Sequence, residues 1–195
     1  MKMLHTLLIS TLMGTSALMA QLPSVSSVKP AAVAEKWQTR TAYVRFFSTT
    51  PVEDIEAVNN QVSSILDPLK GEFAFQVPIK GFVFEKALMQ EHFNENYLES
   101  GKHPNATFTG KIVDFDPSKL TGTGKIKWVL RGKMSIHGQE KEMDIPIELT
   151  PKANKGVIEA KFKVVPEDFG IKIPSAVRNK IAKDIEVSVK ADYAG

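Results

Sequence analysis

Residues 88–110, LMQEHFNENYLESGKHPNATFTG, hold the side chains of this sequence that are most capable of chemistry. Two histidines stand here with three glutamates: His92, His103, Glu91, Glu95 and Glu99. Imidazole and carboxylate groups bind transition metals and act as general acids and bases. Which of these roles is open to them depends on the faces of the helix that the stretch is expected to form.

With Leu88 as the reference, a helical period of about 100° per residue places the polar side chains of His92 and Asn96 inside the apolar arc. The rest of that arc is formed by Met89, Phe93 and Tyr97. The glutamates mostly fall on the opposite, water-facing side. Gly101 is placed to end the helix in a left-handed conformation.

A metal site in this helix would use His92, Glu95 and Glu99, with His103 added only if the following loop folds back. Zinc sites usually have a tighter set of three or four ligands, so we predict no metal and no cofactor. Two interpretations of His92 remain, a buried histidine bonded to the backbone and a polar group at the mouth of an apolar cavity. The sequence has no recognisable nucleophile–base pair, phosphate loop or catalytic carboxylate pair, so we predict a protein that is not an enzyme.

The elements that must position this helix are strands. From Trp37 onward apolar and polar residues alternate with a period of two, which is typical of half-buried β-strands. Seven or eight antiparallel strands with short helices predict an all-β sandwich or barrel. A barrel of about eight strands has an interior that is either filled by side chains or able to hold one small ligand.

Residues 125–149 predict one β-hairpin in detail. His137-Gly138 fits a two-residue turn, in which Gly138 supplies one of the two positive φ angles. Residues whose numbers sum to 275 then face each other, with opposite charges on one side and apolar pairs on the other. The expected pairs are Lys133 with Glu142, Arg131 with Asp144, Lys127 with Glu148, Leu130 with Ile145, Trp128 with Ile147 and Ile126 with Leu149. A slip of one residue would turn every core side chain outward.

Two further short helices are expected from local signals. Thr50-Pro51-Val52-Glu53 matches a capping box with proline at the first helical position, which predicts a helix over about 51–58. Ser175 is placed to cap a second helix in the following AVRNKIAK.

The N-terminal residues and the composition indicate an exported single-domain protein. Residues 1–20 have one lysine, an apolar run and small residues, as in a signal peptide, and residues 21–36 are typical of a linker. The domain is expected over 37–195. The chain has no Cys, so neither a disulfide nor a lipid-modified cysteine can form. The net charge is only +3, and the lysine and arginine side chains of the predicted hairpin face acidic residues of the neighbouring strand. Both observations argue against nucleic acid as a partner.

Four stretches occur in an order that resembles one known family: MQEHF, ATFTGKI, GKMSIHGQEKEMDIPIEL and EDFGIKIP. Together they are similar to the YceI-like family of lipocalin-like, polyisoprenoid-binding proteins, over about residues 40 to 193. The resemblance implies an extended antiparallel lipocalin-like β-barrel of about eight strands. It also implies an elongated apolar tunnel for an isoprenoid or similar lipid tail, and export to the periplasm.

Carried over by position, His92 and Phe93 match the helix motif of the family, and the hairpin and the late Asp168-Phe169-Gly170 look architectural. The first strand departs from the pattern, because Arg45 stands in a stretch where many members carry a histidine. From the residues alone, the large aromatics could form an ordinary core or line a cavity. With the resemblance, the predicted lipid-binding residues are Phe73, Phe75, Met89, His92, Phe93, Asn96, Phe108, Trp128, Met134 and Phe162.

The resulting functional prediction is an exported, non-enzymatic carrier of a polyisoprenoid or other long-chain amphiphilic lipid. The alternative is a barrel with a filled core, which would act as an interaction module for another envelope protein. The volume of the interior distinguishes the two. The sequence leaves the oligomeric state open, and no segment after the signal peptide is apolar and long enough to predict a membrane span.

Overall fold

The computed structural model describes residues 35–153 and 155–194. The predicted signal peptide and nearly all of the predicted linker therefore lie outside the described residues. Within those residues the strands are β1 (Trp37–Thr49), β2 (Asp54–Leu66), β3 (Glu72–Pro78), β4 (Val83–Phe84), β5 (Asn105–Ile112), β6 (Ile126–Ile136), β7 (Gln139–Lys152), β8 (Lys155–Val164) and β9 (Ile185–Asp192). The helical elements are α1 (Ala87–His92), the π-helical turn η2 (Phe93–Tyr97) and the 3₁₀ turns η1 (Ile79–Gly81), η3 (Pro117–Thr121), η4 (Pro166–Phe169) and η5 (Ser175–Val177).

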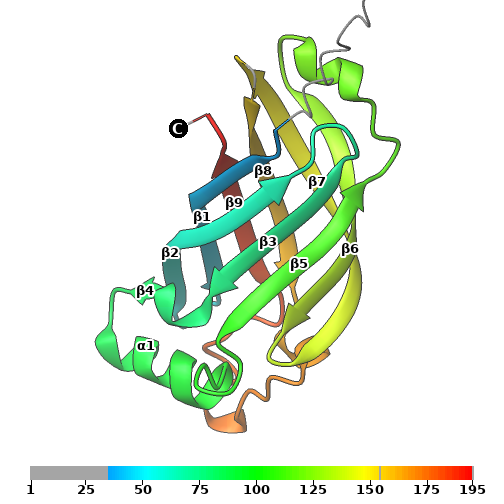
Figure 1. Ribbon diagram of the computed structural model, residues 1–195. Coiled ribbons are helices and arrows are strands. Elements are labelled where there is room, and N and C mark those ends of the chain that lie inside the picture. The colour runs from blue at the N-terminus through cyan, green and yellow to red at the C-terminus, as the bar shows by residue number, and fades with distance from the viewer. Residues whose placement is uncertain (1–34, 154, 195) are drawn as a thin grey trace, which may run out of the picture. The chain divides into compact units, whose positions relative to one another are not determined.

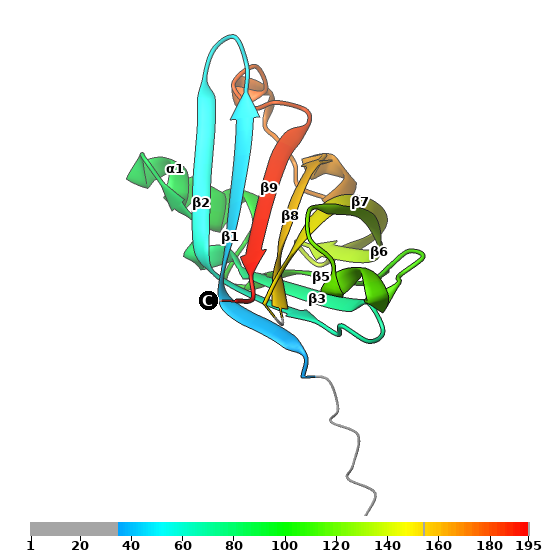
Figure 2. The same cartoon turned by 90° about the horizontal axis from the view of Figure 1, so that it is seen from above.

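Eight of these strands close into an antiparallel barrel, with α1 at one end of it (Figures 1 and 2). The strand order is β1-β9-β8-β7-β6-β5-β3-β2, and pairing of β1 with β2 completes the ring. The short β4 adds to β2 at Ala57 and Val58. A closed sheet leaves few unpaired backbone groups at its edges. The structure thus confirms the predicted eight-stranded barrel and excludes the sandwich.

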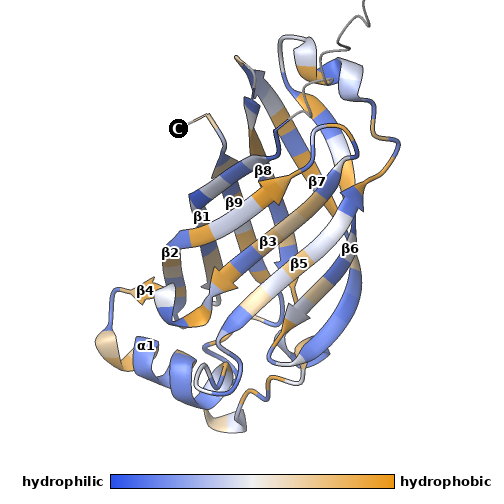
Figure 3. Ribbon diagram, in the orientation of Figure 1, coloured by the Kyte–Doolittle hydropathy of each residue, from blue (hydrophilic) through white to orange (hydrophobic). Residues whose placement is uncertain are grey.

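Buried and more exposed residues alternate along strands such as β3 and β6, and hydrophobic and hydrophilic residues follow one another along the strands of the barrel (Figure 3). In β3, for example, Phe73, Phe75 and Val77 are buried, whereas Glu72 and Gln76 are exposed. This period of two arises from the pleat of the strand, which turns successive Cβ atoms to opposite faces. The inward set of the ring forms one continuous apolar interior.

The predicted β6–β7 hairpin is confirmed residue by residue, because all six expected pairs face each other in the structure. His137 and Gly138 have φ angles of 52° and 74°, as a two-residue turn with two left-handed residues requires. On the outer face Arg131 donates two hydrogen bonds to the Asp144 carboxylate, at 2.8 and 2.7 Å. The pattern of charges and apolar residues therefore does set the register here.

The predicted helix over 51–58 is wrong, because the chain turns at 50–53 and continues as β2. The capping contacts form: the Thr50 hydroxyl accepts hydrogen bonds from the amides of Val52, at 3.2 Å, and Glu53, at 3.1 Å. They close the β1–β2 hairpin instead of starting a helix, and Thr49 pairs with Asp54. In β2 every second residue is buried, at 57 and 59 and, after a shift in register, at 62, 64 and 66; this long-range pairing with β1 outweighs a local signal.

The second predicted helix is also wrong. Ser175–Val177 forms only a 3₁₀ turn, with Pro174 at its N-cap and no side-chain cap, and residues 178–184 form turns and bends. A helix of eight residues is marginal without strong packing. Here the segment satisfies its backbone elsewhere, since the Ala182 amide donates to the Ser48 hydroxyl at 2.9 Å.

The third helix forms with a different geometry from that expected. After α1 the chain widens into a π-helical turn, in which the Leu98 amide donates to the Phe93 carbonyl at 2.9 Å. The left-handed residue that follows is Glu99, with a φ of 42°, and not the predicted Gly101. A π-turn rotates the chain less per residue than an α-helix, so the faces of the residues after Phe93 differ from those predicted at 100° per residue.

Candidate functional site: an apolar cavity in the barrel

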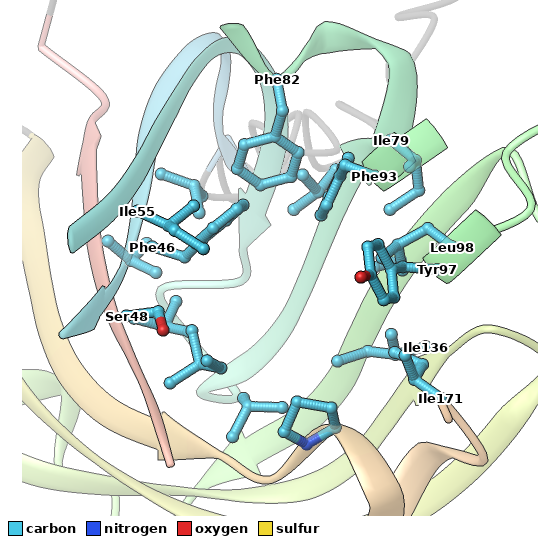
Figure 4. A pocket seen from close by; sticks show the side chains of 18 of the residues that line it. Phe46, Ser48, Ile55, Ile79, Phe82, Phe93, Tyr97, Leu98, Ile136 and Ile171 are labelled. Carbon is cyan, nitrogen blue, oxygen red and sulfur yellow. The ribbon is translucent and has the colours of Figure 1, made fainter. Parts of the chain in front are cut away.

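The barrel encloses a cavity of about 560 Å³, surrounded by inward-facing side chains (Figure 4). This volume lies within the usual range of small-molecule sites. All nine strands, β1 to β9, contribute to its wall, and so do α1, η2 and the segment that follows η5. The closure of the sheet is therefore what positions residues from all parts of the described chain around one space.

The wall of the cavity is almost entirely hydrocarbon. Nine aromatic side chains contribute to it: Phe46, Phe73, Phe75, Phe82, Phe84, Phe93, Tyr97, Phe108 and Phe162. Between them lie aliphatic side chains such as Ile55, Leu130, Met134 and Ile147. An enclosure of this kind offers dispersion contacts and few hydrogen bonds, so it suits a long apolar group and not a polar solute.

Four phenylalanines form a cluster beneath α1. The Phe93 ring, from the π-helical turn, lies 5.4 Å from Phe46 and 5.5 Å from Phe82, measured between ring centroids (Figure 4). Phe84 approaches Phe93 at 5.0 Å. These distances are in the range of favourable aromatic pairs. The cluster joins β1, the β4 region and the helical segment into one side of the cavity.

The charged residues of the wall come from turns and helical segments and not from the middle of the strands. Glu53 lies in the β1–β2 turn, Lys86 precedes α1, and Lys180 follows η5. The Lys86 ammonium is 3.1 Å from the Glu53 carboxylate, and the Lys180 ammonium is 4.0 Å from it. His92 stands on the same α1 side. The cavity is thus apolar inside, with a polar rim on one side.

The opposite end of the barrel is filled. Trp37, Leu66, Leu149 and Tyr193 are buried to 5% exposure or less and do not line the cavity. The Tyr193 hydroxyl lies 2.6 Å from the Ser64 hydroxyl, both of them buried. Burial raises the pKa of the Tyr193 phenol well above its usual value, against the smaller effect of that hydrogen bond. The interior therefore consists of a solid half and a hollow half.

Eight of the ten predicted lipid-binding residues line the cavity. They are Phe73, Phe75, Met89, His92, Phe93, Phe108, Met134 and Phe162. His92 is exposed, which rules out the interpretation as a buried histidine and leaves it at the rim.

The other two, Asn96 and Trp128, do not line the cavity. Asn96 is exposed, because the π-helical turn directs Tyr97 and Leu98 inward in its place. Trp128 faces the interior in the filled half, where its ring packs on Phe115 at a centroid distance of 5.3 Å. The period of a strand predicts which face a residue occupies and not how far along the barrel the hollow extends.

Several lining residues were missed from the sequence, among them Phe46, Ile55, Phe82, Phe84 and Tyr97. The alternating aromatics of GFVFEK carry the same signal as Phe73 and Phe75 and could have identified Phe82 and Phe84. Phe46 follows Arg45 in the strand that departs from the family pattern. Tyr97 falls in the apolar arc predicted for the helix, so the helical period already indicated that it faces inward, although it was not among the predicted lipid-binding residues.

The metal set considered from the sequence does not assemble. Among the described residues, the structure instead brings Glu99 together with His103 and His137, and His92 and Glu95 are not part of that group. The loop after η2 thus does fold back, but toward the β6–β7 turn and away from α1.

None of the helices within residues 35–153 and 155–194 combines the length and the apolar character that a membrane span requires.

Comparison with solved structures shows the same fold in distant sequences. BcnA of Burkholderia cenocepacia shares 15% identity, with a TM-score of 0.64 over 77% of this chain and 96% of the other. A polyisoprenoid-binding domain from Saccharophagus degradans, described as implicated in plant cell wall breakdown, shares 13% identity, with a TM-score of 0.66 over 81% of this chain and 96% of that domain. The YCEI protein of Campylobacter jejuni shares 13% identity, with a TM-score of 0.51 over 92% and 96%.

Comparison of sequences gives the family. No curated protein matches the chain significantly in sequence. The model of the YceI-like domain, however, matches residues 32–193, which covers the whole barrel. This match spans most of the sequence and agrees with the closed eight-stranded fold, and so the chain belongs to the family of proteins with a YceI-like domain.

Proposed function

We propose that this protein is a carrier that holds the tail of one isoprenoid or other long-chain lipid in the barrel cavity, without catalysis. The observation that carries the proposal is the cavity itself, about 560 Å³ enclosed by nine aromatic and many aliphatic side chains. Membership of the YceI-like family supports it, and one structural relative is described as a polyisoprenoid-binding domain.

A lipid with an apolar tail and a polar headgroup matches a cavity with an apolar wall and a polar rim. Transfer of each buried CH₂ group from water to an apolar enclosure is favourable by about 0.8 kcal/mol, so a few isoprene units offset the entropic cost of binding. The headgroup of the lipid would remain at the rim, within reach of His92, Lys86 and Lys180. The tail would contact the seven apolar members of the predicted lining set, which are all of that set except His92, together with the Phe46 side of the cavity.

The proposal also includes export. Residues 1–20 have the layout of a signal peptide and residues 21–36 that of a linker, so we place the barrel domain, 37–195, in the periplasm after cleavage. Mass spectrometry of the protein recovered from a periplasmic fraction would test this. Detection of the uncleaved N-terminus in the cytoplasm only would contradict it.

The filled-core interaction module is the less favoured function. It requires an interior closed by side chains, and only one half of the barrel meets that requirement.

Recovery of a bound lipid tests the carrier function directly. Native mass spectrometry of the purified protein, followed by organic extraction, is expected to show one apolar molecule of defined length per chain. Ala160→Trp projects an indole into the cavity from β8 and is expected to abolish the bound mass.

The matched control for this test is Val129→Trp, at a position that is 36% exposed and does not line the cavity. This variant should retain the lipid, and circular dichroism would verify that both variants fold. Failure to recover any lipid from the unmodified protein, or equal retention by the two folded variants, would refute the proposal.

A further inference from the structure

Three side chains from separate parts of the chain converge outside the cavity. Glu99 and His103 lie in the loop after η2, and His137 is the first residue of the β6–β7 turn. One ligand atom from each lies within 4.8 Å of the other two, and all three residues are partly buried. The His137 Nε2 atom is 3.0 Å from Glu99 Oε2, and the two imidazole rings meet edge to face at a centroid distance of 4.8 Å.

Both ring nitrogens of His137 have hydrogen-bond acceptors as partners. Nδ1 is 3.3 Å from the carbonyl oxygen of Phe169, which can only accept, so Nδ1 carries a proton. In the neutral ring Nε2 then directs a lone pair at the Glu99 carboxylate, which is also an acceptor. A metal ion bound by Nε2 and Oε2 would satisfy both atoms, and so would a proton on Nε2.

The backbone around the three residues is shaped to bring them together. Glu99 and His137 both have positive φ angles, of 42° and 52°. Gly138 leaves room for the His103 ring, because a Cβ atom there would lie 2.7 Å from His103 Cε1. The other charged group at this place is Lys102, whose ammonium pairs with Glu99 through the second carboxylate oxygen. The Lys102 side chain is 73% exposed, so it can leave Glu99 at little cost.

We propose that Glu99, His103 and His137 bind one divalent transition-metal ion of the zinc class. Two imidazoles and one carboxylate are a donor set that zinc uses in proteins with a fourth position left to water, whereas calcium and magnesium prefer oxygen ligands alone. The carbonyl of Phe169 orients His137, as the outer partners of metal-bound histidines commonly do.

To bind such an ion, the three ligand atoms, which lie within 4.8 Å of one another, must draw closer together. Ligand atoms around tetrahedral zinc lie roughly 3.3 Å apart, given bonds of about 2.0–2.1 Å. Glu99 and His137 already meet this spacing at 3.0 Å, so His103 is the residue that must approach. None of the three ligands lines the cavity, but their neighbours Leu98 and Ile136 do. The ion would therefore fix the η2 loop to the hairpin turn next to the cavity wall.

Zinc titration of the full chain tests the proposal. Untagged protein, stripped with EDTA and dialysed, is titrated with ZnCl₂ in a calorimeter, and MgCl₂ serves as the comparison ion. We expect one zinc per chain and no heat from magnesium. His103→Ala and Glu99→Gln should each weaken zinc binding at least tenfold. Glu91→Gln, which alters an exposed glutamate outside the cluster, should leave zinc affinity unchanged.

A spectroscopic readout distinguishes this site from adventitious binding. Cobalt(II) in place of zinc gives visible absorption when it is four-coordinate, and this band should disappear in His103→Ala. Glu99→Gln provides the second variant in case the first does not fold, as judged by circular dichroism. The absence of stoichiometric zinc binding by the unmodified protein would overturn the proposal, and so would equal affinities for all folded variants. The cluster would then be a hydrogen-bonded His–Glu pair beside a second histidine.

Discussion

At the scale of single residues, the filled half of the barrel depends on a polar pair inside an apolar core. Tyr193 and Ser64 are 0% and 1% exposed, and their hydroxyls share one hydrogen bond of 2.6 Å. A buried hydroxyl without a partner costs free energy, so the two residues tolerate burial only together. The Ser64 hydroxyl has a second, longer contact, to the Ala74 carbonyl at 3.4 Å.

Tyr193→Phe is expected to change the dependence of stability on alkaline pH. Burial raises the pKa of the Tyr193 phenol, so the folded protein keeps this proton while the unfolded chain releases it above pH ~10. The stability from the protonated phenol is therefore complete below pH ~10 and falls above it, by up to about 1.4 kcal/mol per pH unit.

At pH 7 the free energy of unfolding of the variant should be lower by about 1 kcal/mol, because one hydrogen bond is missing. Above pH ~10 its free energy of unfolding should not show the fall that deprotonation of Tyr193 causes. Urea denaturation between pH 7 and pH 11 measures both effects. The other tyrosines are common to both proteins and cancel. If the free energies of unfolding of the two proteins fall in parallel above pH ~10, Tyr193 does not cause the alkaline decline.

At the scale of elements, the β6–β7 hairpin and the loop after η2 differ in what they require of glycine. Gly138 has a φ of 74° and stands against the His103 ring. Gly101 has no positive φ, and a Cβ atom there would meet nothing within 4 Å. The two glycines therefore form a matched pair, one required by the backbone and one not.

Gly138→Ala is expected to destabilise the protein by about 1–2 kcal/mol, the cost of a left-handed conformation for a residue with a Cβ atom. Gly101→Ala should change the free energy of unfolding by no more than about 0.5 kcal/mol. Thermal or urea denaturation of the two variants checks the difference. A larger effect at Gly101 would mean that the loop after η2 has a different backbone.

The elements also show where sequence reasoning succeeds. The β6–β7 register was predictable, because charges and apolar residues on adjacent strands leave one consistent pairing. The Thr50 and Ser175 signals failed, because capping contacts are local and serve a hairpin turn as well as a helix. Of the cavity, the inward faces of the strands were predictable. The π-helical turn was not, and neither was the convergence of Glu99 with His103 and His137, since both depend on contacts between distant segments.

At the scale of the whole domain, stability and the proposed binding reside in different halves of the barrel. Leu66 is fully buried, pairs with Trp37 across β1 and β2, and does not line the cavity. Phe162 is only partly buried and faces the hollow half. The same kind of truncation should thus have opposite effects at the two positions.

Leu66→Ala is expected to lower the free energy of unfolding by about 2–5 kcal/mol, because it opens a void in a packed core. It should leave the amount of copurified lipid unchanged. Phe162→Ala should cost less stability, since its ring already borders empty space, and should reduce the bound lipid. Denaturation curves and native mass spectra of the same two samples test both statements. Loss of lipid in both variants, or in neither, would show that the halves are not independent.

The filled half of the barrel limits the route by which a lipid can enter and leave the cavity. A ligand cannot pass through a barrel that is filled at one end. A lipid of the proposed kind must therefore enter tail first and leave by the same opening. Its headgroup then stays accessible throughout, available to whatever donates or receives the lipid. Exchange would require that partner to approach the polar rim of the cavity, where Glu53, Lys86 and Lys180 lie.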